Sequence, residues 1–359
     1  MTAITFEHVT KRFPPGYPGA EAVLAVDNIS FKIPQGDVIA ILGPSGCGKS
    51  TLLRIAAGLM EPDSGTVYYD GIPLKNVPLQ DRGIGMVFET GALMPHWETR
   101  RSVGFFLNLR HREHEVPERV ARISQITGIG IEHLLDRRPH QLSGGEQQRV
   151  SVARALTRDM RLLLFDEPFA NLDAKLRTQS RIELNRLLRE YPVTALYVTH
   201  DQAEAVSLSK RIAIMRAGQF EQLGTYQQLY ESPRNLFVAQ FIGTPTINLF
   251  AGHVADGHWY GENFGGYPIR SDLANGTPVT LGIRPQYFSL VPDGVPGVVD
   301  NVVPHLSEKF QLVEVWLAKE RWSLAVPLDA QIPLGSTIYC ELNPDEALYF
   351  DSRTGVRIG

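Results

Sequence analysis

Apolar residues stand at every second position in the first part of the chain, and continuous apolar runs follow further on. The alternating positions are Ile4, Phe6, Val9, Leu24, Val26, Ile29, Phe31 and Ile33. This period of two is typical of half-buried strands, so we predict an antiparallel β portion at the start. The run DVIAIL at 37–42 then has strand length, and KSTLLRIAAGLM at 49–60 has leucine and isoleucine at helical spacing. A strand, a glycine-rich loop and a helix are therefore expected in succession.

Two further apolar runs end in polar residues. They are RLLLFDE at 161–167 and TALYVTH at 194–200. Runs of this length fit strands that are buried on both faces, and such strands form parallel sheets whose functional groups gather at the carboxyl ends. The charge-rich stretch around 103–160 has a helical pattern. We therefore predict an α/β core with an antiparallel β subdomain and a helical subdomain.

The pattern of apolar and polar residues changes after about residue 235. Short strand-like runs are separated there by Gly, Pro, Asn and Asp, and they include PVTLGIR, LVEVWLA, WSLAVPL and STIYCEL. Short strands with turn residues between them are typical of an all-β domain. We predict two domains, residues 1–235 with the α/β core and residues 236–359 with an all-β, barrel-like fold.

The composition and charge of the chain argue against nucleic-acid binding and against a membrane-spanning or secreted protein. The chain has 359 residues, of which 43% are hydrophobic and 21% charged, and its formal net charge is −4. Binding of nucleic acid needs clustered Lys and Arg, and the chain has no long basic run, so we expect no nucleic acid partner. No apolar run approaches the ~18 residues of a membrane span, and the N-terminus MTAITFEHVT lacks the features of a signal peptide, so a cytosolic chain is expected. Cys47 and Cys340 are expected to be reduced thiols.

The loop GPSGCGKST at 43–51 carries the strongest chemical signal. Gly43, Gly48, Lys49 and Ser50 match the spacing of a phosphate-binding loop between a strand and a helix. The glycines let backbone N–H groups converge on phosphate oxygens, Lys49 would neutralise the β and γ oxygens, and the Ser50 hydroxyl would reach Mg²⁺. The competing interpretation is a chance turn with the same spacing.

Acidic and imidazole groups stand at the ends of the other two predicted strands. Asp166 would place a carboxylate near the metal, and Glu167 would orient the attacking water or accept its proton. His200 is a candidate for sensing or stabilising the γ-phosphate. The alternatives are a solvated sheet edge for the two acids and a structural role for the histidine.

Five segments in this order, GPSGCGKST, LSGGEQQR, LLLFDEP, ANLD and YVTH, resemble the nucleotide-binding subunit of an ATP-binding cassette (ABC) transporter over about residues 3–235. The tail segments FVAQFIGTPTINLF, LGIRP and NPDEALYFDSRTGVRI are similar to the C-terminal regulatory domain of maltose-type importer ATPases. The resemblance implies a P-loop NTPase core, an OB-like regulatory domain, and ATP with Mg²⁺ as ligands. It assigns catalysis to Glu167 and His200, and metal binding to Ser50, Glu89 and Asp166.

The resemblance also implies that two copies pair head-to-tail, so that LSGG of one copy covers ATP held by the phosphate loop of the other. The implied nucleotide-binding positions are Phe13, Gly43, Ser45, Gly46, Cys47, Gly48, Lys49, Ser50, Thr51, Ser143, Gly144, Gly145, Glu146 and Asp173. Ser143 would begin a helix whose N-terminal partial positive charge suits a γ-phosphate. Ser143 and Glu146 also have the spacing of a plain capping box, and both interpretations can hold together.

Two of these positions have open alternatives. Phe13 occupies the place where the family stacks adenine, but it could instead be a core aromatic on an edge strand, and Tyr17 is a rival for the stacking. Glu89 stands where the family usually has glutamine. A carboxylate is a good oxygen ligand for Mg²⁺, and the alternative is that Glu89 points to solvent.

We therefore expect the ATP-hydrolysing subunit of an ABC importer at the cytoplasmic face of the cell membrane. It would work as a homodimer or with a near relative, beneath two integral-membrane permease subunits and, indirectly, with a solute-binding protein. A sugar is the expected solute, with polyamine, sulfate, iron and glycerol-phosphate as rivals. A soluble ABC ATPase acting on nucleic acid or ribosomes is an alternative class, and a module that binds a partner through its C-terminal domain is a third.

Overall fold

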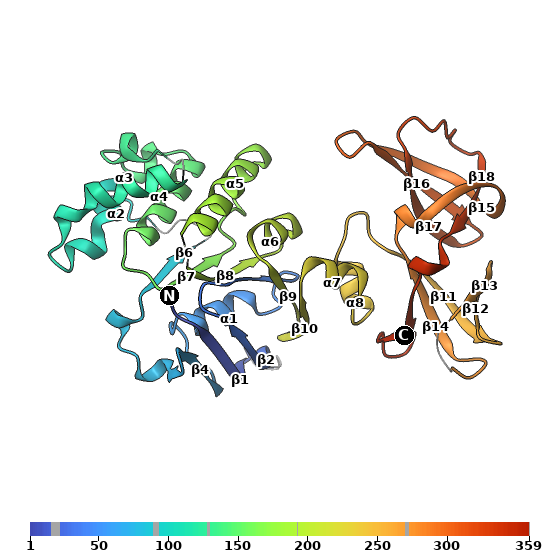
Figure 1. The fold of residues 1–359 in the computed structure, drawn as a ribbon, viewed down its shortest axis with the longest axis horizontal. Coiled ribbons are helices and arrows are strands. Elements are labelled where there is room, and N and C mark those ends of the chain that lie inside the picture. The colour runs from blue at the N-terminus through green and yellow to red at the C-terminus, as the bar shows by residue number, and fades with distance from the viewer. Residues whose placement is uncertain (16–21, 89–92, 128–129, 192, 270–272, 359) are drawn as a thin grey trace. The chain divides into compact units, whose positions relative to one another are not determined.

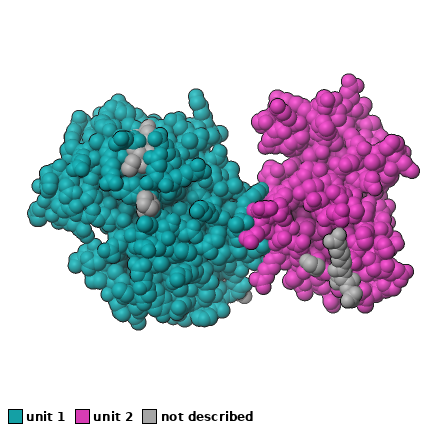
Figure 2. All heavy atoms as spheres, viewed as in Figure 1, with its two compact units in different colours: residues 1–226 teal, residues 227–359 magenta. Residues whose placement is uncertain are grey.

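The structure, a computed structural model, describes residues 1–15, 22–88, 93–127, 130–191, 193–269 and 273–358. The chain forms two compact units, Met1–Tyr226 and Gln227–Gly359 (Figure 2). The expected domain boundary at 235/236 falls inside the second unit. Most of α7 (Tyr226–Glu231) and all of α8 (Leu236–Phe241) group with the β strands that follow them.

The first sheet of the first unit is antiparallel and has the strand order β2-β1-β4-β5. Its strands are β1 (Ile4–Phe13), β2 (Val23–Ile33), β4 (Ser64–Tyr69) and β5 (Ile72–Pro73). Apolar residues of β1 and β2 are buried together, and the rings of Phe6 and Phe31 stack with their centroids 4.4 Å apart. The antiparallel β portion predicted from the period of two is therefore confirmed.

The central sheet of the first unit carries the predicted strand ends. Its order is β10-β9-β3-β8-β7-β6, and all of its strands are parallel except β10. The strands are β3 (Val38–Leu42), β6 (Ile84–Val87), β7 (Leu162–Asp166), β8 (Thr194–Thr199), β9 (Arg211–Arg216) and β10 (Gln219–Gly224). Leu42 pairs with Thr199, and Val198 pairs with Asp166. This register brings the carboxyl ends of β3, β8 and β7 to one edge.

Helices surround this sheet and also form a separate helical group. Near the sheet lie α1 (Lys49–Ala56), α5 (Ala174–Glu190) and α6 (Gln202–Leu208). The helical group consists of α2 (Thr99–Asn108), α3 (Val116–Thr127) and α4 (Gly144–Leu156), which pack on one another (Figure 1). Short 3-10 turns connect these elements at Leu74–Asn76, Leu79–Asp81, Glu113–Glu115, Glu132–Leu134 and Pro139–Gln141.

The second unit contains two antiparallel sheets that share one core. Their strand orders are β13-β12-β11-β14-β19-β20 and β17-β16-β15-β18. The strands are β11 (Asn248–Ala255), β12 (His258–Gly261), β13 (Gly265–Pro268), β14 (Pro278–Ile283), β15 (Phe288–His305), β16 (Phe310–Leu317), β17 (Glu320–Pro327), β18 (Thr337–Leu342), β19 (Leu348–Asp351) and β20 (Arg357–Ile358). Two 3-10 turns, Pro285–Tyr287 and Pro344–Glu346, lie between strands. The all-β character of the C-terminal part is confirmed.

One buried arginine explains why α7 and α8 belong to this second unit. Arg284 is 2% exposed, and its guanidinium donates to the backbone oxygens of Ile242 at 2.7 Å and Tyr230 at 2.9 Å. It also lies 3.6 Å from the centroid of the Tyr230 ring. Because β14 ends just before Arg284, this side chain joins the end of β14 to the segment that contains both helices.

Among the described residues, no helix combines the length and the apolar character needed to cross a bilayer.

We expect Arg284→Met to destabilise the second unit by about 2–4 kcal/mol, because two buried carbonyl groups lose their donors. Urea unfolding followed by tryptophan fluorescence measures this, since Trp259, Trp316 and Trp322 all lie in that unit. Arg353→Met is the matched control, because the Arg353 side chain is 77% exposed. Equal unfolding midpoints for the two variants would contradict the role given to Arg284.

Candidate functional site

The glycines of the phosphate loop are required by the close approach of other backbone segments. Gly48 precedes α1 with φ +108°, and a Cβ there would lie 1.9 Å from the Ala25 carbonyl oxygen. A Cβ on Gly43 would lie 2.2 Å from the Met215 carbonyl oxygen. The loop is thus a bare-backbone turn at the N-terminus of a helix, which is the arrangement that binds phosphate through N–H groups.

Lys49 is held at the centre of this loop. Its side chain is only 4% exposed, and Nζ donates to the carbonyl oxygens of Gly43 at 2.9 Å and Pro44 at 3.1 Å. Nζ also lies 3.5 Å from Glu167 Oε1. A buried ammonium group is costly unless it is paired and hydrogen-bonded, so these contacts keep the charge of Lys49 in place.

Ser50 and Asp166 meet across the sheet edge. The Ser50 hydroxyl donates to Asp166 Oδ1 at 2.7 Å, although the two residues are far apart in sequence. Among the described residues, no group of three or more His, Cys, Asp or Glu side chains could hold a metal ion. The Ser50 hydroxyl and the Asp166 carboxylate fit Mg²⁺, because that ion is commonly bound by one or two protein oxygens together with phosphate oxygens and water.

Glu167 has a strained backbone and a fixed partner. Its φ is +44°, in the left-handed region that costs a residue with a side chain roughly 1–3 kcal/mol. Its N–H donates to Val198 O at 3.0 Å, which holds the turn after β7 against β8. His200 Nδ1 lies 2.7 Å from Glu167 Oε2, and the His200 side chain is 52% exposed. The strain aims the Glu167 carboxylate at both Lys49 and His200.

The remaining loop residues are arranged as a turn with an exposed outer side. Ser45 and Gly46 are exposed, whereas Ser50 and Thr51 are half-buried. Cys47 is buried, and burial raises the pKa of its thiol. Both Cys47 and Cys340 are free thiols, as the sequence predicts.

The LSGG segment begins a helix, as expected. Ser143 is the N-cap of α4, its Oγ accepts from Glu146 N at 3.3 Å, and Glu146 Oε2 accepts from Ser143 N at 2.8 Å. The capping box is therefore confirmed. The bond from the Ser143 backbone is the largest of the effects that lower the Glu146 pKa. Ser143 and Gly144 are exposed, so the N-terminus of α4 is open to a ligand.

Helix α5 begins against the same segment. A Cβ on Gly145 would lie 2.4 Å from Leu176 Cδ2, so a larger residue there would require the Leu176 side chain to move. Asp173 caps α5 by accepting from Leu176 N at 2.9 Å. No hydrogen bond or ion pair recorded for the described residues joins Ser143, Glu146 or Asp173 to the phosphate loop. Two separate clusters of site residues therefore lie on the first unit.

Three residues expected at the site need separate comment. Phe13 is the last residue of β1 and is half-buried, opposite Val23. Strand β1 lies between β2 and β4, but its pairing with β4 ends at Thr10, so Phe13 is paired on one side only and both interpretations of it stay open. Tyr17 and Glu89 lie outside the described residues.

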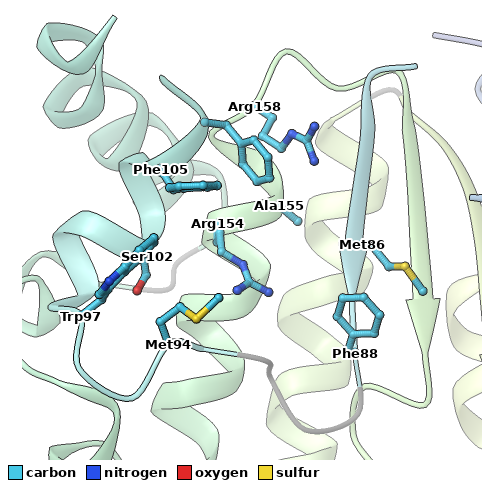
Figure 3. A pocket seen from close by; sticks show the side chains of 10 residues that line it. Met86, Phe88, Met94, Trp97, Ser102, Phe105, Arg154, Ala155 and Arg158 are labelled. Atoms are coloured by element: carbon cyan, nitrogen blue, oxygen red, sulfur yellow. The ribbon is translucent and has the colours of Figure 1, made fainter. Parts of the chain in front are cut away.

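A pocket of about 260 Å³ separates the last strand of the central sheet from the helical group. In Figure 3, Met86 and Phe88 lie on the strand side of the pocket, Trp97 and Phe105 lie on the helical side, and Arg154 extends between the two sides. The wall is mostly apolar. The pocket is therefore suited to an amphipathic segment that buries apolar side chains.

Positive charge lies at the side of this pocket. The Arg158 guanidinium is stacked 3.5 Å from the centroid of the Phe106 ring. Burial, together with the neighbouring charges of Arg110 and Arg154, lowers the Arg158 pKa to about 10. None of the ion pairs recorded for the described part of the chain includes Arg158. An acidic group in the pocket would thus find a cation that it could pair with.

A parallel sheet with a phosphate loop after one strand, and a Ser–Asp pair and a Glu–His pair beside it, defines a P-loop nucleoside triphosphatase. Comparison with known proteins identifies which kind. Residues 26–170 match the family model described as ABC transporter.

Curated relatives match the whole chain. The sn-glycerol-3-phosphate import ATP-binding protein UgpC of Escherichia coli K12 is 40% identical over 371 residues, which cover 100% of both proteins. The uncharacterized ABC transporter ATP-binding protein y4oS of Sinorhizobium fredii is 40% identical over 365 residues, 100% of this chain and 95% of the relative. The chain belongs to the ABC transporter family and is an ABC importer ATPase.

Solved structures support the same fold for the first part of the chain. A dimeric structure of MJ0796, a bacterial ABC transporter cassette, is 32% identical with a TM-score of 0.55, and it covers 62% of this chain and 98% of its own. A dimeric post-hydrolysis state of MJ0796 bound to ADP and Pi is 30% identical with a TM-score of 0.53, over the same shares of the two chains. The family therefore supports ATP or ADP as the ligand of the phosphate loop.

Sequence reasoning missed several residues that the fold brings to these sites. The ion pair of Lys49 with Glu167 joins two segments far apart in sequence, and no local pattern signals it. Trp97 and Arg158 of the pocket likewise come from separate segments. The four-residue spacing of Arg154 and Arg158 could have predicted that both arginines lie near one pocket. Residues four apart lie on the same side of a helix, here the end of α4 and the turn that follows it.

The phosphate loop offers a matched pair of glycines for a stability test. Gly46→Ala places its Cβ in open space, so we expect only the cost of a left-handed alanine, about 1 kcal/mol. Gly48→Ala collides with the Ala25 carbonyl, so we expect a loss of about 3 kcal/mol or more. Urea unfolding without nucleotide, followed by far-ultraviolet circular dichroism, compares them. Similar losses in the two variants would show that backbone contact does not select glycine at position 48.

Proposed function

We propose that this chain hydrolyses ATP with Mg²⁺ as half of a head-to-tail pair, formed with a second copy or a near relative. The pair acts at the cytoplasmic face of the membrane, and its closure powers solute uptake through two integral-membrane subunits. A solute-binding protein delivers the solute to those subunits. The observation that carries the proposal is the meeting of Lys49, Glu167 and His200 at three neighbouring strand ends. These residues supply a phosphate ligand, a proton acceptor and an orienting group.

Hydrolysis transfers the γ-phosphoryl group to water. The water oxygen bonds to phosphorus, the bond from phosphorus to the ADP oxygen breaks, and Glu167 orients the water and accepts its proton. His200 holds the Glu167 carboxylate through Nδ1 and contacts the γ-phosphate. Lys49 exchanges its carbonyl partners in the loop for the β and γ oxygens. Cys47, Ser45, Gly46 and Thr51 contribute their backbone or side chains to the same phosphate cradle.

Ser50 and Asp166 are the proposed holders of Mg²⁺. Their oxygen atoms are already in contact at 2.7 Å, so both can face one small ion. The ion would neutralise charge that builds up on the phosphate oxygens during transfer. The side chain of Ser50 would then turn its lone pairs, rather than its proton, toward the metal.

The exposed N-terminus of α4 supports the head-to-tail pair. Ser143 and Gly144 are open to solvent, and the partial positive charge of α4 suits a γ-phosphate. In such a pair, the second copy would bring its own phosphate loop to this surface. Glu146 would reach toward the ribose, Asp173 would contact the partner copy, and Phe13 would stack on adenine.

The pocket of Figure 3 is the proposed contact with a membrane subunit. An apolar wall with Arg154 and Arg158 beside it is complementary to a cytoplasmic segment that carries apolar residues and an acid. Arg101 adds a cation at this surface, since its guanidinium lies 4.5 Å from the centroid of the Trp97 ring. The pocket borders both the central sheet and the helical group, so a segment bound there would sense movement between them.

The solute is proposed from the relatives alone. Full-length relatives carry the name sn-glycerol-3-phosphate import ATP-binding protein. We propose a small carbohydrate-like solute, either a sugar or glycerol phosphate. Uptake of labelled sn-glycerol-3-phosphate and of labelled sugars by cells with and without this gene separates the two, and uptake of neither would contradict the class.

Glu167→Gln should bind ATP but lose about 10²–10⁴-fold in turnover, because a positioned proton acceptor is removed while the phosphate loop stays intact. ATP should then trap a dimer, which size-exclusion chromatography with and without ATP detects. Glu183→Gln is the matched control, because Glu183 on α5 pairs with Arg149 on α4 and touches none of the proposed catalytic groups. Near-normal hydrolysis by Glu167→Gln would refute the assignment.

Arg158→Glu should weaken binding to the membrane subunits by at least about tenfold, because it places a negative charge where an acid is expected. ATP hydrolysis by the isolated subunit should be unchanged. Copurification with the membrane subunits in detergent measures the loss. Arg189→Glu is the control, since Arg189 lies exposed on α5 outside the pocket. Equal copurification of both variants would exclude the pocket as the docking site.

A further inference from the structure

A buried carboxylate lies next to the segment that carries His200. Glu204 is in α6 and is only 3% exposed. A carboxylate in such surroundings is costly unless hydrogen bonds compensate it, so the groups that it binds indicate its role. None of the roles given above to the site residues uses Glu204.

Two buried hydroxyl groups of β8 donate to Glu204. Its Oε2 accepts from Thr199 Oγ1 at 2.7 Å and from the Tyr197 hydroxyl at 2.9 Å. Tyr197 and Thr199 are at most 1% exposed, so no solvent replaces Glu204 as their acceptor. Burial raises the Glu204 pKa, and the bonds from Thr199 and Tyr197 oppose that rise.

Both neighbours of His200 in the chain are connected to Glu204, Thr199 through the carboxylate and Asp201 through the Thr199 hydroxyl and the Glu204 backbone N–H. Thr199 precedes His200 and donates to the Glu204 side chain. Asp201 follows His200; its N–H donates to Thr199 Oγ1 at 3.0 Å, and its Oδ1 accepts from Glu204 N at 3.1 Å. The backbone of His200 is thus held on both sides by one residue of the next helix.

The same network reaches the strand that carries Glu167. The Tyr197 ring lies 5.5 Å from the Phe165 ring and 6.4 Å from the Phe169 ring, between centroids. Phe165 and Phe169 stand on either side of Glu167 in the sequence. The His200 side chain is 52% exposed, so its packing constrains the ring only in part, and its 2.7 Å contact with Glu167 depends on the backbone position as well.

We propose that Glu204 is a positioning residue for ATP hydrolysis, which fixes the segment 199–201 so that His200 meets Glu167. The proposal rests on the proposed roles of His200 and Glu167. A misplacement of about 1 Å in a catalytic group can cost about 10²-fold in rate, so a residue that does not touch the substrate can control turnover.

A purely structural role makes a different prediction. Removing the Glu204 side chain leaves two buried hydroxyl groups without an acceptor, which should lower the thermal unfolding midpoint of the chain. That loss alone would reduce the amount of folded enzyme but leave each folded molecule with normal turnover. A positioning role lowers turnover per folded molecule, and the effect disappears when His200 is absent.

The first experiment measures steady-state ATP hydrolysis by the full chain. Glu204→Ala should lower kcat by about 10–100-fold and leave KM for ATP within about twofold, because the phosphate loop is untouched. Glu204→Gln should keep most of the activity, since its amide oxygen can still accept both bonds. Val206→Ala is the control, as Val206 is 41% exposed on the same helix. Normal kcat in correctly folded Glu204→Ala would overturn the proposal.

The second experiment is a double-mutant cycle with His200→Ala. If Glu204 acts through His200, adding Glu204→Ala to His200→Ala should change kcat by less than about twofold. If the loss of kcat in the double variant equals the product of the losses in the two single variants, the proposal is overturned. Full activity of His200→Ala and Glu167→Gln would instead refute the proposed function, so the two failures are distinguishable.

The third experiment covers the case in which Glu204→Ala does not fold. Thr199→Val removes the hydroxyl that joins Glu204 to Asp201 but keeps the shape of the side chain, whereas Thr199→Ser keeps the hydroxyl. Thr199→Val should lower kcat several-fold, and Thr199→Ser should restore it. Equal kcat for the two variants, with thermal unfolding confirming that both fold, would overturn the proposal.

Discussion

The parallel pairing of β3 with β8 and of β8 with β7 is the constraint on which the chemistry of this protein depends. Leu42 lies opposite Thr199, and Val198 lies opposite Asp166. These pairs are the last residues of their strands, or next to last, so the phosphate loop, Glu167 and His200 emerge at one edge. A slip of one residue in either pair would turn the alternating side chains to opposite faces and separate the groups.

The buried charge of Lys49 at this edge is balanced by contacts within the protein. Lys49 is nearly fully buried, and two backbone carbonyls and Glu167 surround its ammonium group. Glu167 in turn keeps a left-handed backbone, which the bond from its N–H to Val198 maintains. The site therefore stores strain and buried charge where a phosphate with its metal would bind, and a ligand that relieves both gains affinity for that reason.

The first unit has two surfaces that are open to a ligand or a partner. The N-terminus of α4 leaves Ser143 and Gly144 exposed, and the pocket beside α4 combines an apolar wall with Arg158. Helix α4 thus carries a phosphate-type surface at its start and an amphipathic surface near its end. A helix shared in this way would couple the nucleotide to whatever segment occupies the pocket, because both surfaces move with one rigid element.

The sequence by itself determined the strands, the phosphate loop, the capping box at Ser143 and the family, because each depends on residues that are close together in the chain. The residue types of Asp166, Glu167 and His200 also predicted catalytic and metal-binding groups at the ends of two strands. Only the tertiary structure decided that Lys49 pairs with Glu167, that Glu204 holds both neighbours of His200, and that Arg284 joins α7 and α8 to the β domain. Those contacts join segments whose separation along the chain carries no local pattern, since the pairing of strands and the burial of polar groups arise only when the whole sheet is assembled.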